Sequence, residues 1–101
     1  MAQITISSGV ADTWATIYNV QKGAMVQIAG TFVGTITIQR RPAASKYPGS
    51  SWTTMETQSI PIVRAIDENA IADYRVGLVL AGDYTSGSVQ CTIQSQSAEG
   101  A

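Results

Sequence analysis

Hydrophobic and polar residues alternate along several stretches of this chain, and the alternation predicts β-strands. Successive side chains of a strand point to opposite faces of a sheet, so a period of two gathers the apolar residues on one face. The clearest stretches cover residues 32–39, 72–80 and 89–94. Weaker candidates bring the total to about eight short strands, and they cover residues 3–7, 13–18, 24–29, 52–57 and 60–66.

Turn residues separate these stretches at intervals that suit an antiparallel fold. Gly30 and Thr31 predict a tight hairpin between two strands, and residues 42–51 predict a longer loop with two prolines. No segment shows convincing apolar spacing of 3.6 residues. The pattern therefore predicts an all-β, antiparallel two-sheet β-sandwich of the jelly-roll or immunoglobulin-like type. We expect one domain over residues 1–95 and a flexible C-terminal tail over residues 96–101.

The low charge of the chain bears on its partners. Of the 101 residues, 45% are hydrophobic and 13% are charged, about half the usual charged share of ~25%. A neutral surface rich in Ser, Thr and Gln suits a protein that packs against its own copies or a partner. The net charge is −1 and the basic residues are scattered, which excludes a nucleic-acid-binding face. The N-terminus lacks a signal sequence and no apolar run could span a membrane, so we expect synthesis in a cytoplasm.

Candidate chemistry is sparse. The chain has one cysteine and no histidine, so Cys91 has neither a disulfide partner nor a histidine base, and its phase places it in the core. Glu56 and Asp73 lie in strand segments, but nothing in the sequence marks them as a catalytic pair. Acidic residues near 67–69 and 83 are typical of turns and lack the spacing of a calcium loop. We therefore expect no enzyme activity, no metal and no cofactor.

The aromatic residues and the loop after residue 40 are the candidate binding features. We expect Trp14 and Trp52 to fill the core, although an exposed Trp52 beside Tyr47 would suit carbohydrate binding. The same loop carries the only clustered positive charge. The predicted partner-binding residues are therefore Arg40, Arg41, Lys46, Tyr47 and Trp52.

Four segments of the chain resemble one protein family. They are residues 30–40 (GTFVGTITIQR), 52–53 (WT), 74–77 (YRVG) and 82–87 (GDYTSG). Together they resemble small β-sandwich structural proteins of tailed bacteriophages. Relatives usually continue after Gln-Arg with a short Asp-Gly-Gly turn, whereas residues 41–50 here are longer and lack it. Any ligand role of that turn is therefore not carried over.

The resemblance implies a virion structural protein that is assembled in the host cytoplasm. The expected role is a capsid decoration or cement protein that binds the lattice of the major capsid protein. Such proteins commonly sit on symmetry axes, which favours a homotrimer, and the strand at residues 3–7 is a candidate arm that pairs with a neighbouring sheet edge. The alternatives are a neck, tail or fibre component, or a carbohydrate-binding adhesion module.

Overall fold

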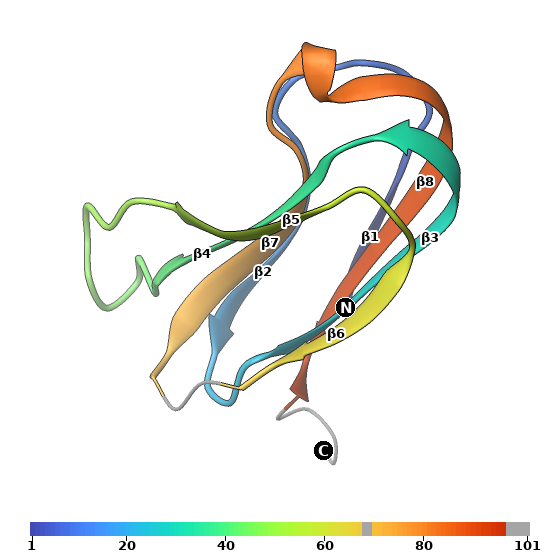
Figure 1. Cartoon of the computed structure of the whole chain (residues 1–101). Coiled ribbons are helices and arrows are strands. Elements are labelled where there is room, and N and C mark those ends of the chain that lie inside the picture. Colours follow the sequence, from blue (N-terminus) through green and yellow to red (C-terminus); the bar gives the residue numbers. More distant parts are fainter. Residues whose placement is uncertain (68–69, 97–101) are drawn as a thin grey trace.

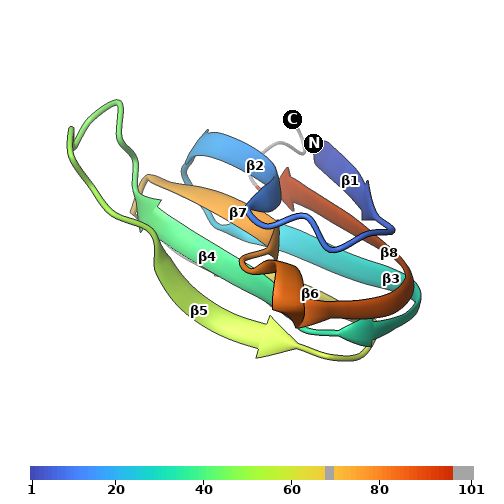
Figure 2. The same cartoon turned by 90° about the horizontal axis from the view of Figure 1, so that it is seen from above.

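The computed structural model describes residues 1–67 and 70–96 and contains two four-stranded antiparallel sheets that pack face to face (Figures 1 and 2). The first sheet has the order β1-β8-β3-β6 and the second the order β2-β7-β4-β5. The predicted all-β two-sheet sandwich is confirmed. The strands are β1 (Ala2–Ile6), β2 (Thr13–Val20), β3 (Ala24–Gly34), β4 (Ile36–Pro42), β5 (Thr53–Gln58), β6 (Ile62–Ile66), β7 (Ala72–Leu78) and β8 (Tyr84–Ser95), with the 3-10 helix η1 (Ala81–Asp83) before β8.

The strand order is that of a long hairpin rolled into a sandwich. Strands at equal distances from the middle of the chain pair with each other, namely β1 with β8, β2 with β7, β3 with β6 and β4 with β5. Consecutive strands lie in opposite sheets except β4 and β5, which makes the β4–β5 loop the hairpin tip. This is the jelly-roll arrangement. It differs from the immunoglobulin fold, in which the first two strands are neighbours in one sheet.

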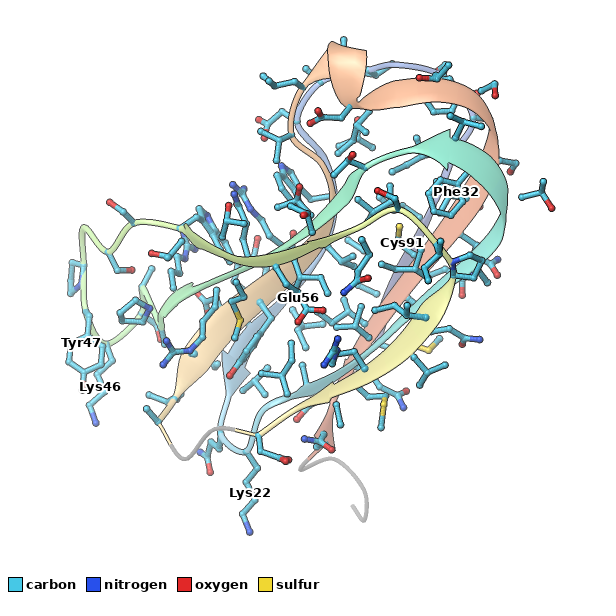
Figure 3. All side chains as sticks on the ribbon, in the orientation of Figure 1. Lys22, Phe32, Lys46, Tyr47, Glu56 and Cys91 are labelled. Carbon is cyan, nitrogen blue, oxygen red and sulfur yellow. The ribbon has the colours of Figure 1, made fainter. Side chains whose placement is uncertain are left out.

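The core lies between the two sheets and is built by the predicted alternation. Residues 74, 76 and 78 of β7 point inward, as do residues 89, 91 and 93 of β8, and all six side chains are fully buried. Cys91 is therefore a core residue, as its phase predicts (Figure 3). The largest fully buried side chains include Tyr74, Ile28, Ile36, Ile38, Leu78 and Ile93.

The predicted hairpin at Gly30 and Thr31 is wrong, because β3 continues without a break and pairs with β8 up to Gly34. Gly30 has a φ of 115° and Gly87 on β8 a φ of 93°. Glycine adopts such angles without steric cost, so each bends its strand without ending it. The two long strands curve together at one end of the molecule (Figure 1).

Residues 32–39, predicted as one strand, belong to two strands. The break falls at Thr35, where the chain passes from the first sheet to the second. Of the tail predicted at residues 96–101, residues 97–101 lie outside the described part of the chain. The backbone N–H of Gln96 donates to the carbonyl of Gly23 at 3.1 Å, and its side chain donates to the carbonyl of Ile66 at 3.0 Å.

Replacing Gly30 with alanine should destabilise the fold. A Cβ at this position would overlap the carbonyl oxygen of Ser88 on β8, and the positive φ strains any L-residue. We expect Gly30→Ala to lower the free energy of unfolding by about 1–3 kcal/mol, measured by urea denaturation. Gly82→Ala is the matched control, because nothing lies within 4 Å of its added Cβ. Equal effects of the two substitutions would contradict this account of the bend.

Candidate functional site

The hairpin tip projects from the sandwich and is held in one conformation by its own hydrogen bonds (Figure 1). The backbone N–H groups of Lys46 and Tyr47 donate to the carbonyl of Ala43, at 3.0 and 2.8 Å. Ser50 closes the loop, because its hydroxyl donates to the carbonyl of Pro42 at 2.7 Å. Lys46 and Tyr47 lie at the outer end (Figure 3), with the ammonium 5.8 Å from the ring centroid.

A buried carboxylate fastens this loop to the second sheet. Asp73 of β7 is 1% exposed, and its oxygens accept from the N–H of Asn19 at 2.9 Å, from Nε of Arg41 at 2.8 Å and from the N–H of Ala44 at 3.2 Å. The carboxylate therefore joins β2, β4, β7 and the start of the loop. Asn19 has a φ of 56°, a left-handed conformation that asparagine tolerates better than most residues. The side chain of Asn19 also accepts from the hydroxyl of Ser45.

Two arginines and two tryptophans stack on the outer face of the second sheet. The guanidinium of Arg75 lies 4.0 Å from the ring centroid of Trp14 and 4.3 Å from that of Trp52. The guanidinium of Arg41 lies 4.4 Å from the Trp52 ring. The strand register explains the grouping, because Trp14 lies opposite Gly77, which has no side chain, and Arg75 is the next outward residue of β7. We call these four residues the arginine–tryptophan array.

Hydrogen bonds fix the array in place. Nε of Arg75 donates to Oε1 of Gln39 at 2.8 Å, and the amide of Gln39 donates to the hydroxyl of Thr54 at 3.2 Å. The indole N–H of Trp14 donates to Oδ1 of Asp12 at 2.5 Å. Burial lowers the pKa of Arg75, and the negative charge of Asp12 offsets this in part. Arginine nevertheless stays protonated at physiological pH, so the array keeps its positive charge.

The expectation that Trp14 and Trp52 fill the core is wrong. Both are half-buried on the outer face, and the core between the sheets is filled by aliphatic side chains and Tyr74 instead. Trp14 immediately precedes the buried Ala15. The alternation of inward and outward side chains along β2 could therefore have predicted that Trp14 points outward. Sequence reasoning also missed Arg75, although it lies between the inward residues Tyr74 and Val76. Its role depends on side chains from other strands.

The five predicted binding residues all lie on the hairpin tip or its base, but they do not form one site. Arg41 and Trp52 are in contact on the outer face, while Lys46 and Tyr47 form a separate pair at the tip. Arg40 is opposite the buried Tyr74 in the register of β4 and β7, so it has the opposite direction to Arg41. It lines a hollow of about 340 Å³, together with Pro42, Tyr47, Ala70 and Ile71.

The two carboxylates on strand segments do not converge on one site. Glu56 and Asp73 face opposite sides of the second sheet, because Glu56 is opposite the buried Ile38 and Asp73 is opposite Arg41. Within residues 1–67 and 70–96, no three His, Cys, Asp or Glu side chains gather closely enough to hold a metal ion. No helix in this part of the chain has the length and apolar character needed to cross a membrane.

Comparisons with known protein families, curated proteins and solved structures gave no match. The geometry of the tip and of the array is therefore the basis for assigning a role. It offers an ordered loop, stacked aromatic and cationic groups and neutral hydrogen-bonding side chains. These groups are suited to binding.

Protonation of Asp73 should destabilise the protein in acid. Burial by itself raises the pKa of Asp73, but the N–H of Asn19, the Arg41 guanidinium and the N–H of Ala44 outweigh it, so the pKa lies below its ordinary 3.8. The stabilisation is complete above pH 3.8 and is lost as the pH falls through the lower folded-state pKa. We expect Asp73→Asn to cost about 2 kcal/mol at pH 7 and to flatten the acid dependence in urea denaturation. The exposed Asp67→Asn is the control, and an equal loss there would contradict the proposed anchor.

The thiol of Cys91 should be unreactive in the folded protein. Burial raises its pKa to about 12, so both the thiolate and access to it are lacking at neutral pH. We expect no reaction with Ellman's reagent under native conditions and full reaction after denaturation. In a Cys91→Ser background, Ser88→Cys places a thiol at an exposed position of the same strand and should react at once. Rapid labelling of native Cys91 would show that β8 opens.

Proposed function

We propose that this chain is a non-catalytic structural subunit of a tailed-phage virion, and specifically a decoration protein that binds the lattice of the major capsid protein. The supporting observation is the nature of its sheet edges. A virion subunit must bind many neighbouring copies or partners, and an unprotected strand edge provides backbone donors and acceptors for that purpose.

The four edge strands almost lack charge. The strands β1, β2, β5 and β6 form the ends of the two sheets, and they contain two charged side chains, Glu56 and Arg64. These two bind each other at 3.2 Å across the gap between β5 and β6. Monomeric β-proteins usually protect their edges with lysine, proline or inward charges. Glu56 and Arg64 are inward charges of this kind on β5 and β6, because they lie opposite the buried Ile38 and Val26. The edge strands β1 and β2 carry no charged side chain, so these two edges favour pairing with other chains.

The fold and the sequence resemblance support the specific virion role. Jelly rolls recur in viral capsid proteins and in lectins, although a fold by itself does not define a function. The segments at residues 30–40, 52–53, 74–77 and 82–87 resemble phage structural proteins, and the charged share of 13% suits dense packing. A homotrimer on a threefold axis is the expected assembly.

A carbohydrate-binding module is the second candidate function. The half-buried Trp52 at the base of the tip favours it, because sugar-binding proteins stack sugar rings on accessible tryptophans. This role is compatible with the first, since assembly through strand edges leaves the outer face of the second sheet free.

Light scattering and capsid sedimentation test the assembly. We expect a mass three times the 10.6 kDa of one chain. When the chain is co-expressed with the major capsid protein encoded in the same genome, we also expect it to sediment with the capsids. Thr5→Lys on β1 and Val63→Lys on β6 place charge on exposed edge positions, and at least one should abolish assembly. Gln90→Lys is the control, because it adds the same charge to an exposed position of the central strand β8. A strict monomer that does not sediment with capsids would overturn the proposal.

A further inference from the structure

Arg75 is a half-buried cation whose direct contacts are all neutral. It lies against the rings of Trp14 and Trp52, and its hydrogen bond goes to the amide oxygen of Gln39. Among the described residues it forms no ion pair, whereas Arg41 and Arg64 each bind a carboxylate. Removing a cation from water without an anionic partner is unfavourable, so the position is suited to an anion from outside the chain.

The edge of the Arg75 guanidinium is available to such an anion. The group carries five N–H donors, of which Nε supplies one to Gln39. The guanidinium carbon lies 4.0 and 4.3 Å from the centroids of Trp14 and Trp52, and no described residue accepts a hydrogen bond from its terminal nitrogens. A carboxylate can accept two parallel hydrogen bonds from those nitrogens. Because stacking fixes the plane of the guanidinium, little side-chain entropy remains to be lost on binding.

The surroundings of Arg75 narrow the choice of ligand. Thr16 lies directly opposite Arg75 on β2, and Thr54 is exposed beyond Gln39. Tyr18 follows on the outer face of β2 and is 60% exposed. The face therefore combines aromatic surface, neutral hydroxyls and one positive charge that the nearby Asp12 offsets only in part. A sugar ring offers an apolar C–H face and hydroxyls that match these groups, whereas a nucleic acid would require a broad basic surface.

We propose that the outer face of the second sheet binds a carboxylated sugar unit of an acidic polysaccharide. Arg75 receives the carboxylate, and the sugar ring packs against the accessible surface of Trp14, because the guanidiniums of Arg41 and Arg75 already lie over the Trp52 ring. The assignment stands on the contacts of the arginine–tryptophan array and does not depend on capsid binding. It rests on the carbohydrate-binding candidate given above and deepens it by naming the class of sugar, and it uses a surface other than the strand edges proposed for assembly.

Tryptophan fluorescence tests the proposal directly, because both tryptophans of the chain belong to the array. The full chain is titrated with oligogalacturonate, an oligosaccharide with one carboxylate on each sugar. We expect a saturable change in emission that weakens as sodium chloride is added. A neutral oligosaccharide of equal length should produce no such change. Absence of any response to oligogalacturonate would overturn the proposal.

Substitutions of Arg75 and Lys22 distinguish specific binding by Arg75 from non-specific attraction between a negatively charged ligand and any positively charged residue. We expect Arg75→Gln to weaken binding about tenfold or more, the loss of roughly one charge-assisted contact. Lys22→Gln is the matched control, because it makes the same change in net charge at the exposed turn between β2 and β3 (Figure 3), and it should retain affinity within about twofold. Arg75→Lys keeps the charge but loses the planar stack, so it should bind with intermediate affinity. Equal losses in Arg75→Gln and Lys22→Gln would show only non-specific electrostatics.

Two further measurements deal with a variant that does not fold and with a competing class of ligand. Circular dichroism shows whether the Arg75→Gln variant folds. If the variant does not fold, the indole N–H resonances of the wild-type protein are followed by NMR during the titration instead. Those of Trp14 and Trp52 should shift with oligogalacturonate, and unchanged resonances would overturn the proposal. Poly-L-glutamate is the competing ligand. An equal response to it would mean that the surface recognises acidic peptide, which would reject the carbohydrate assignment while leaving the proposal of capsid binding untouched.

Discussion

The carboxylate of Asp73 is the contact on which the functional end of this molecule depends. It is buried on the outer face of β7 and binds one group from β2, one from β4 and one from the start of the β4–β5 loop. A buried carboxylate is stable only when its oxygens are satisfied. The three donors are therefore held together. Because Arg41 is one of them, its hydrogen bond to Asp73 also positions the guanidinium that stacks on Trp52.

The second sheet uses its two faces for different purposes. Its inner face provides Ile36, Ile38, Tyr74, Val76 and Leu78 to the core. Within residues 1–67 and 70–96 no second layer covers its outer face, and there the large side chains pack against one another instead. Tryptophan and arginine suit this arrangement because an indole and a guanidinium stack as planar groups and keep their polar edges in water. The array is thus both a cover for the sheet and a rigid, charged surface.

Assembly and ligand recognition would use separate parts of the molecule. Strand addition requires backbone groups along β1, β2, β5 or β6, whereas the array presents side chains on the outer face of the second sheet. The hairpin tip extends beyond both and is ordered by its own hydrogen bonds. A rolled hairpin produces this division naturally. The roll exposes two edges of each sheet and leaves the tip as the loop that projects from it.

The sequence by itself determined the all-β class, the number of strands and the inward side chains of β7 and β8, including Cys91. These follow from a period of two, which is a local property that needs no knowledge of neighbours. It did not separate the jelly roll from the immunoglobulin fold, because pairing order depends on contacts between distant segments. It also placed a hairpin at Gly30, since a glycine that bends a strand and one that ends a strand have the same local sequence.

The binding surface was determined only in part by the sequence. The loop with Arg40, Arg41, Lys46 and Tyr47 stood out because its charges and turn residues are close along the chain. The tertiary structure decided that Arg40 and Arg41 have opposite directions and that Trp52 is on the outside. It also brought Trp14 and Arg75 to Trp52 from strands far apart in the sequence. Alternation tells which face a residue occupies, but strand order alone decides which residues meet there.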